Sequence, residues 1–355
     1  MGNCNIYGQE IEEEDLNQSS RNFEFLELLG QGNFGKVWKV QRKKTKEYFA
    51  MKVMDKELII RKQYATVVMQ EQNILTSIRH PFLVNLISSF QDKKRLYLTL
   101  DLLTGGDFRQ HLNYNKVFSE EQTKFFIACI IVALDYLHSQ GIIHRDLKPE
   151  NLVMDHRGYL RLTDFGLASI WRPNNSQEIN GTLGYIAPEI MCKQNHGIAV
   201  DYFALGVIAY ECMFGKRPYR GTNANQIRDL FLSQQVQIKQ SQLPIGWSLE
   251  AGDFINKLIQ RKPENRLGAN SPSDVKNHRW FQNFNWQNLQ SKIIIPPYQP
   301  KRKFSCVENS QQCCENKKQM NKIILNDQQQ CINKFKPLAQ FEGYCFEAEQ
   351  IKNKV

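Results

Sequence analysis

Motifs that would place this chain outside the cell, across a membrane or around a structural metal are missing from its 355 residues. The nine cysteines form no CxxC pair and have no histidine partner at zinc-ligand spacing, so neither a zinc ribbon nor a disulfide framework is indicated. The longest apolar run, at residues 125–134, is too short to cross a bilayer. No secretory signal is visible, and we expect a reducing, cytoplasmic setting.

Acidic residues are the only charged residues in the first twenty positions, although the formal net charge of the chain is +10. The excess of Lys and Arg could attract nucleic acid, anionic lipid or acidic proteins. These basic residues are scattered, and no groove-reading motif or stacking repeat accompanies them. A solvated surface is therefore favoured and no nucleic acid is expected, with a basic nucleic-acid-binding protein kept as an alternative.

The hydrophobic pattern changes along the chain and predicts an α+β fold. Alternating segments predict a small sheet first, and from Ser119 the pattern becomes helical, with Gln122 completing a capping box. Residues 307–333 are rich in Gln, Asn and Lys and are interpreted as a flexible tether. The strands are predicted at residues 23–29, 37–40 and 48–54.

Three glycines in the segment LGQGNFGKV give the first indication of chemistry. Glycines let the backbone fold closely over phosphates and present amide donors to them. The GxGxxG spacing also occurs in dinucleotide-binding turns and in plain hairpins, but here a strand-like segment follows, where a dinucleotide site requires a helix. The predicted nucleotide contacts of this segment are Leu29, Gly30, Gln31, Gly32, Asn33, Phe34, Gly35, Lys36 and Val37.

A strand lysine and a helix glutamate form the second candidate feature. Lys52 faces away from the apolar side chains of its strand, where a cation could meet phosphate oxygens, although a lone strand lysine is usually just exposed. Glu71 lies among apolar residues at helical spacing. Because an unpaired carboxylate is costly to bury, we expect Glu71 to pair with Lys52. The alternative is a glutamate at the edge of the stripe, facing water.

The most specific signal is the run HRDLKPEN at residues 144–151, followed by DFG at 164–166 and APE at 187–189. Phosphoryl transfer requires the protein to hold metal, align a hydroxyl and neutralise charge. Asp146 is the candidate that orients the hydroxyl and accepts its proton, and Lys148 the one that steadies the phosphoryl group. Asn151 and Asp164 are the candidate magnesium ligands. A chance loop of solvated charges would have to reproduce every one of these spacings.

On these motifs, residues 23–281 resemble a eukaryotic protein kinase domain. The segments at 84–92 and 101–107 resemble the AGC group of Ser/Thr kinases, in particular the cyclic-nucleotide-dependent kinases and the YANK branch. The resemblance implies a bilobal fold, ATP and Mg²⁺ as cofactors, and Ser or Thr hydroxyls as acceptors. It divides the chain into an arm (1–22), a β-rich N-lobe with one key helix (23–103), a mainly α C-lobe (104–281) and a tail (282–355).

The same resemblance assigns further residues to the nucleotide and to the scaffold. It implies that Ala50 contacts ATP, that Leu100 is the gatekeeper and that the backbone of Asp101 and Leu103 binds adenine. It also implies that Asp201 braces the catalytic loop and that Arg266 pairs with Glu189 as a structural latch. A pseudokinase scaffold, which keeps the fold without turnover, is disfavoured because no catalytic position is lost.

Three acidic residues indicate the substrate preference. Asp107, Glu150 and Glu211 match positions that bind arginines before the phosphorylated residue, and carboxylates pair bidentately with guanidinium groups. Thr182 is also expected at the substrate site. We therefore expect a monomeric catalytic unit that acts on proteins with Arg or Lys about two to three positions before the Ser or Thr. The alternative is that these acids are solvated surface residues.

Two segments depart from the AGC pattern in ways that bear on regulation. Glu178 stands where an activation-loop threonine is usual, and its carboxylate is expected to replace part of a phosphate by pairing with Arg145, with Ser176 as the fallback phosphorylation site. The tail carries Phe341, Tyr344 and Phe346, aromatics that are expected to dock on the small lobe without a phosphate switch, because the usual Ser/Thr position is Cys345. The alternative is a disordered aromatic cluster.

The first four residues, Met-Gly-Asn-Cys, indicate myristoylation of Gly2 and palmitoylation of Cys4. The match is incomplete, because Ile6 stands where the motif prefers Ser or Thr, and the acids that follow would be repelled by anionic lipid. Attachment to the cytoplasmic face of a membrane is therefore one of two open alternatives.

Overall fold

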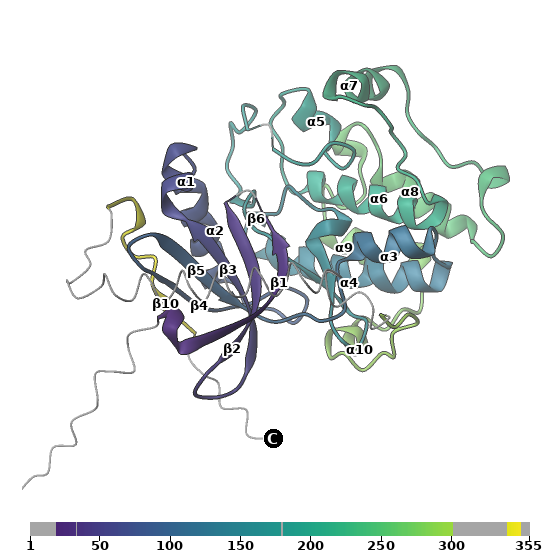
Figure 1. Cartoon of the computed structure of the whole chain (residues 1–355). Helices are drawn as coiled ribbons and strands as arrows, with labels where there is room; N and C mark the ends of the chain where they lie inside the picture. Colours follow the sequence, from purple (N-terminus) through teal and green to yellow (C-terminus); the bar gives the residue numbers. More distant parts are fainter. Residues whose placement is uncertain (1–18, 33, 179, 301–338, 349–355) are drawn as a thin grey trace, which may run out of the picture.

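The computed structural model describes residues 19–32, 34–178, 180–300 and 339–348. It consists of a β-rich N-terminal part followed by a mainly helical C-terminal part, which lie side by side in Figure 1. The expected acylation sites Gly2 and Cys4, the interpreted tether at 307–333 and the loop residue Asn33 lie outside the described residues. The mixed α+β architecture predicted from the hydrophobic pattern is confirmed.

The N-terminal part is built on a six-stranded antiparallel sheet in the order β1-β2-β3-β5-β4-β10. Two helices, α1 and α2, are inserted between β3 and β4. Apolar side chains from one face of β1, β2 and β3 form a small core of their own around Phe25 and Trp38. The elements are β1 (Phe23–Gln31), β2 (Gly35–Arg42), β3 (Tyr48–Asp55), α1 (Lys56–Arg61), α2 (Ala65–Ser77), β4 (Leu86–Gln91), β5 (Arg95–Leu100) and β10 (Phe346–Glu347).

The C-terminal part is organised around α4 and α6, which pack against each other and are buried along most of their length. The predicted capping box begins α4: the Ser119 hydroxyl accepts from the Gln122 amide, and the Ser119 amide donates to the side-chain oxygen of Gln122. The helices are α3 (Phe108–Asn115), α4 (Glu120–Ser139), α5 (Pro188–Met191), α6 (Ala199–Phe214), α7 (Ala224–Ser233), α8 (Leu249–Leu258), α9 (Pro272–Lys276) and α10 (Trp286–Gln290).

Short strands between α4 and α5 place the loops that carry the HRD and DFG sequences. β7 (Leu152–Met154) and β8 (Leu160–Leu162) form one antiparallel pair, and β6 (Ile142–Ile143) and β9 (Ser169–Ile170) form another. The first pair holds Asn151 beside Thr163, whose amide donates to the Asn151 carbonyl at 2.9 Å. Residues far apart in the two motifs are thereby brought together.

A buried ion pair ties α5 to the chain beyond α8. Arg266 donates to both carboxylate oxygens of Glu189, at 2.6 and 3.0 Å, and both side chains are almost fully excluded from solvent. The guanidinium also donates to the carbonyls of Ala199 and Gln260. The structure thus contains the latch pair that the family resemblance implied.

Residues 282–300, the first section of the expected tail, pack against the helical part. After α10, the chain runs to Pro300 along α3 and α4, where the Tyr298 hydroxyl lies 2.9 Å from His111 Nδ1 and accepts from Asn115 at 3.1 Å. The ring of Tyr298 also packs edge-on against Phe118 and Phe126. Residues 282–300 are therefore held by the helical part, although they show no hydrophobic periodicity.

The far end of the tail lies on the N-terminal part, where Figure 1 shows it at the outer edge of the sheet. Phe341 and Tyr344 are completely buried, and β10 adds an edge strand to β4 with Phe346 opposite Ser89. Gln91 Nε2 donates to the Phe341 carbonyl at 2.8 Å. Burial of all three aromatics was expected, but Phe346 is only partly buried, although it packs against the core and its backbone pairs with β4.

Within the described ranges, no helix is both long enough and apolar enough to cross a membrane.

Candidate active site

An ion-pair chain links the two parts of the molecule. Lys52 on β3 contacts both carboxylate oxygens of Glu71 on α2, at 2.7 and 2.9 Å, and lies 4.0 Å from a carboxylate oxygen of Asp164. Glu71 is buried, which excludes the water-facing alternative. Burial alone would lower the pKa of Lys52, but the two carboxylates outweigh it and leave that pKa raised, so the lysine stays charged. A fixed cation is thus held at the boundary of the two parts.

The glycine segment forms the turn between β1 and β2. The Gly32 amide donates to the Gly35 carbonyl at 2.8 Å, and a Cβ on Gly35 would lie 1.8 Å from the Val53 carbonyl oxygen, so no other residue fits there. Phe34 packs on Tyr64 with ring centroids 4.9 Å apart. The hairpin context favoured over a dinucleotide-binding turn is confirmed, because β2 follows the glycines directly.

The predicted adenine-contacting segment follows β5. Leu100 pairs with Ala50 across β3 and β5, so both lie at the same level of the sheet. The Asp101 amide already donates to the Asn85 carbonyl at 3.1 Å, and its side chain is bound by Arg161 and by Asn85. The groups in this segment best suited to a purine edge are therefore the carbonyl of Asp101 and the backbone of Leu103.

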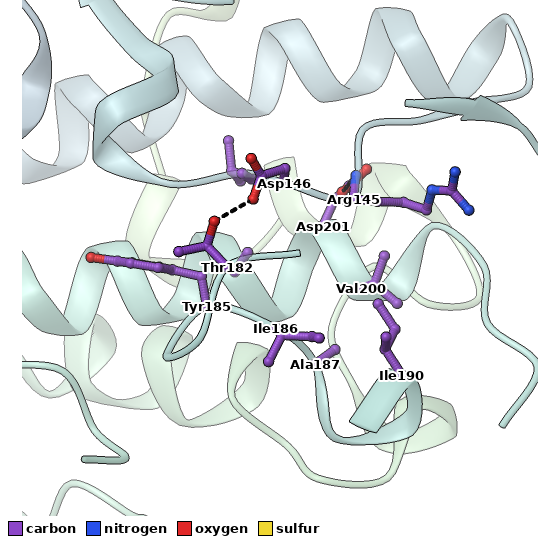
Figure 2. Close-up of a pocket in the computed structure, with 11 residues that line it drawn as sticks. Arg145, Asp146, Thr182, Tyr185, Ile186, Ala187, Ile190, Val200 and Asp201 are labelled. Atoms are coloured by element: carbon purple, nitrogen blue, oxygen red, sulfur yellow. Dashed lines mark hydrogen bonds between the residues drawn. The ribbon is translucent and has the colours of Figure 1, made fainter. Parts of the chain in front are cut away.

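The side chains of Lys148 and Thr182 are hydrogen-bonded to the candidate catalytic carboxylate, Asp146. Lys148 Nζ donates to Asp146 Oδ2 and to Thr182 Oγ1, each at 2.7 Å, and Thr182 Oγ1 donates to Asp146 Oδ1 at 2.6 Å. Figure 2 shows the Thr182 side chain pointing at the carboxylate. The Thr182 hydroxyl therefore occupies a hydrogen-bonding position that an acceptor hydroxyl would need.

The two candidate magnesium ligands lie outside the paired strands β7 and β8, with Asn151 directly before β7 and Asp164 after β8. The Asn151 side-chain amide donates to the Asp146 carbonyl at 2.9 Å and to its carboxylate at 3.0 Å, which fixes the side chain and leaves its oxygen as an acceptor. About half of the Asp164 side chain is exposed. Desolvation by the surrounding protein would raise its pKa, but Lys52 and the Gly166 amide outweigh this and lower the pKa. A carboxylate and an amide oxygen are hard ligands of the kind Mg²⁺ accepts when it keeps waters and phosphate oxygens, so this donor set fits the metal.

Asp201, near the start of α6, holds the catalytic loop in an unusual backbone shape. Its carboxylate accepts from the amides of His144 and Arg145, at 2.9 and 2.8 Å, and lies 2.9 Å from His138 Nε2. Arg145 in this loop has a φ of 65°, in the left-handed region that L-residues rarely adopt. Fully buried hydrogen bonds to Asp201 keep the loop in this conformation, and they lower the pKa of Asp201 despite its burial.

Glu178 connects the catalytic loop to the segment after β9. Its carboxylate is bound by the buried Arg145 guanidinium and, at 2.7 Å, by Arg172, and these contacts lower the pKa of Glu178 against the effect of partial burial. Arg145 also donates to the Leu167 carbonyl at 2.8 Å. The expected contact between Glu178 and Arg145 is therefore present. Ser176 lies apart from this cluster, and its amide donates to the Asn195 side chain.

The three acids proposed to bind substrate arginines are not equivalent. Asp107 is the N-cap of α3, where it accepts from the Gln110 amide at 2.9 Å. Glu150 and Glu211 are both bound by Arg109, each at 2.8 Å. The sequence reasoning missed Arg109. Its place in the first turn of α3 could have indicated it in the sequence, because the helix dipole disfavours a cation there unless carboxylates surround it.

The β-rich part, the helical part and the Lys52–Glu71–Asp164 chain between them define the class of bilobal protein kinase domains. The chain belongs to the protein kinase family: residues 23–281 match the family described as "Protein kinase domain", and its relatives are Ser/Thr kinases of the AGC group.

Three relatives illustrate the similarity. The serine/threonine-protein kinase AtPK1/AtPK6 of Arabidopsis thaliana is 39% identical over 82% of this chain and 62% of its own length. The cAMP-dependent protein kinase catalytic subunit of Dictyostelium discoideum is 38% identical over 79% of this chain and 43% of its own length. The RAC-beta serine/threonine-protein kinase of Homo sapiens is 38% identical over 78% and 58%. The chain thus spans about three fifths or less of these relatives.

Proposed function

We propose that the protein is a Ser/Thr protein kinase that transfers the terminal phosphate of ATP, with Mg²⁺, to hydroxyls of other proteins. The observation that carries the proposal is the hydrogen-bonded set of Asp146, Lys148 and Thr182, standing beside the fixed cation Lys52. A carboxylate that accepts from a hydroxyl, together with cations placed to meet phosphate oxygens, is what transfer of a phosphoryl group to a hydroxyl requires.

In the proposed mechanism, Asp146 acts as the general base. It accepts a hydrogen bond from the acceptor hydroxyl, as it now does from Thr182, and takes the hydroxyl proton as the new P–O bond forms. The bond between the γ-phosphorus and the bridging oxygen of ATP breaks at the same time, and ADP leaves with that oxygen. Lys148 lies 2.7 Å from the Thr182 hydroxyl and is therefore placed to neutralise charge on the transferring group. Bound magnesium would offset further phosphate charge, with Asn151 and Asp164 as its protein ligands.

The nucleotide's phosphates would be held by the glycine turn and by Lys52, whose ion pair with Glu71 fixes the direction of its ammonium group. This pair depends on the position of α2, and the buried tail aromatics lie against α2 and β4. We propose that the docked tail keeps α2 in place and so supports turnover. Glu178 would support it in a second way, by holding Arg145 of the catalytic loop without a phosphate.

The substrates we propose are proteins with basic residues before the Ser or Thr, and the kinase domain acts on them as a monomer. Support for the basic preference comes from the acidic side chains around the Asp146 site, of which Glu150 remains almost half-exposed. The scaffold alternative is disfavoured, because the residues that phosphoryl transfer requires are assembled: Lys52 is paired with Glu71, and Asp146 contacts Asn151.

Transfer of label from ATP to peptide libraries tests the proposal directly. Full-length protein should phosphorylate Ser and Thr peptides but not Tyr peptides, and the reaction should stop when EDTA removes the metal. Asp164→Ala serves as the matched control, because it removes a proposed metal ligand while leaving Asp146 in place. Transfer that survives both EDTA and Asp164→Ala, or that labels only Tyr peptides, would overturn the proposal.

A further inference from the structure

Arg109 is embedded in the acidic cluster beside the catalytic loop. Its Nε donates to Glu150 at 2.8 Å, its Nη1 donates to Glu211 Oε1 at 2.8 Å, and its Nη2 reaches Glu211 Oε2 at 3.3 Å. Nη2 also donates to the Tyr185 hydroxyl, which in turn donates to Glu211. Four donor contacts to two carboxylates and a phenol nearly exhaust the capacity of one guanidinium group.

This cluster lies next to the position of the acceptor hydroxyl. Glu150 directly precedes Asn151, whose side chain is bonded to Asp146. Tyr185 belongs to the turn that begins at Thr182, since its amide donates to the Thr182 carbonyl at 3.0 Å. Glu150 and Tyr185, two of the three partners of Arg109, therefore belong to segments that also contact Asp146, and a peptide with its hydroxyl at Asp146 would run past them.

The guanidinium of a substrate arginine would form the same two carboxylate pairs in this cluster that Arg109 forms. Glu211 is nearly buried, with 10% of its side chain exposed, so little of its carboxylate is left for a second cation. A second cation lies nearby, because the Arg217 guanidinium is 5.7 Å from the centroid of the Tyr185 ring. The cluster therefore presents to an incoming peptide less negative charge than its two glutamates alone would give.

We propose that Arg109 is a specificity-determining residue that occupies the arginine subsite formed by Glu150 and Glu211 and so weakens selection for a substrate arginine there. The inference rests on the proposed kinase function and refines its basic preference. Asp107 is not one of the carboxylates that Arg109 binds, so it remains a separate acid that can select basic residues in the substrate. The alternative role for Arg109 is a purely structural link between α3 and α6.

The test compares kcat/KM for peptide pairs that carry Arg or Ala at one position before the Ser, with each position scanned in turn. In Arg109→Ala the Arg-to-Ala ratio at one position should rise about tenfold or more over wild type, because a charge-assisted pair becomes available to the peptide. Arg109→Lys is the matched control that keeps a cation and should leave the ratio low. A structural link would lower turnover for both peptides equally and leave the ratio unchanged, which would overturn the proposal.

Glu211→Gln in the otherwise unchanged protein gives an independent answer if Arg109→Ala does not fold. Because Arg109 already neutralises Glu211, the Arg-to-Ala ratio of this variant should stay within about twofold of wild type. A large fall in the ratio would mean that Glu211 binds substrate arginine directly, and would overturn the proposal. Absence of transfer to every peptide by wild type would instead count against the kinase function itself.

Discussion

The buried tail tyrosine offers a sharp test of how the tail supports the kinase domain. Tyr344 is completely buried on the N-lobe, and its hydroxyl has no hydrogen-bond partner among the described residues. Burial raises the pKa of the phenol, and the nearby Glu71 carboxylate raises it further, so the group stays neutral. The ring thus contributes packing, whereas the hydroxyl contributes an unsatisfied polar atom.

These opposite contributions predict opposite effects for two substitutions. Tyr344→Ala removes a buried aromatic ring and should destabilise the docked tail by about 3 to 5 kcal/mol. Tyr344→Phe keeps the ring and removes the unpartnered hydroxyl, which costs about 1 to 3 kcal/mol when buried, so this variant should be neutral or more stable. Because α2 carries Glu71, loss of the docked tail should also lower turnover.

Thermal unfolding and kcat measured on the same full-length preparations check both effects. Tyr344→Ala should lower the melting temperature and kcat, and Tyr344→Phe should match or exceed wild type in both. Phe341→Leu controls for general loss of packing at the neighbouring buried site, and it should fall between the two. If Tyr344→Phe were as damaging as Tyr344→Ala, the hydroxyl would be essential, and the packing argument would be refuted.

Two further predictions concern charged contacts. Glu178→Gln should lower kcat severalfold while Ser176→Ala leaves it near wild type; the reverse result would transfer the regulatory role to Ser176. Because the pKa of Glu178 is lowered from about 4.5, its contribution to stability is present above pH 4.5 and is lost as the pH falls below it, and Glu178→Gln should remove that part of the acid sensitivity in a pH-melting series. Glu189→Gln leaves the buried Arg266 charge unpaired and should cost about 3 to 5 kcal/mol in denaturant unfolding, whereas a loss below about 1 kcal/mol would mean that the latch is not stabilising.

Local sequence patterns predicted the elements, and the contacts that one residue's own surroundings require. Alternation located the first three strands, the Ser119 and Gln122 side chains located the start of α4, and a carboxylate on an apolar helix face required the partner found in Lys52. In each case a polar group had a strong physical requirement that only one partner type could satisfy. The contact between Glu178 and Arg145 was expected on another ground, the family resemblance, because Glu178 stands where an activation-loop threonine is usual.

Contacts between distant segments were less accessible to sequence reasoning. Arg109 is 41 positions from Glu150 and 102 from Glu211, and no periodicity links them, so the neutralised acidic cluster was not foreseen. The partial exposure of Phe346 was also missed, because its role is backbone pairing with β4 and its residue type indicates burial. Both depend on tertiary geometry that residue spacing does not encode.

The most direct test of the kinase account is Asp146→Asn in the full-length protein, with magnesium-dependent ATP binding and phosphoryl transfer measured side by side. The substitution keeps the size of the side chain but removes the base, and it replaces one of the two oxygens that accept from Lys148 and Thr182 by an amide nitrogen, which cannot accept. The account predicts that ATP binding is retained while transfer to Ser and Thr peptides falls by about a hundredfold or more. Transfer at the wild-type rate, or equal inactivity of wild type and variant with ATP bound, would contradict it.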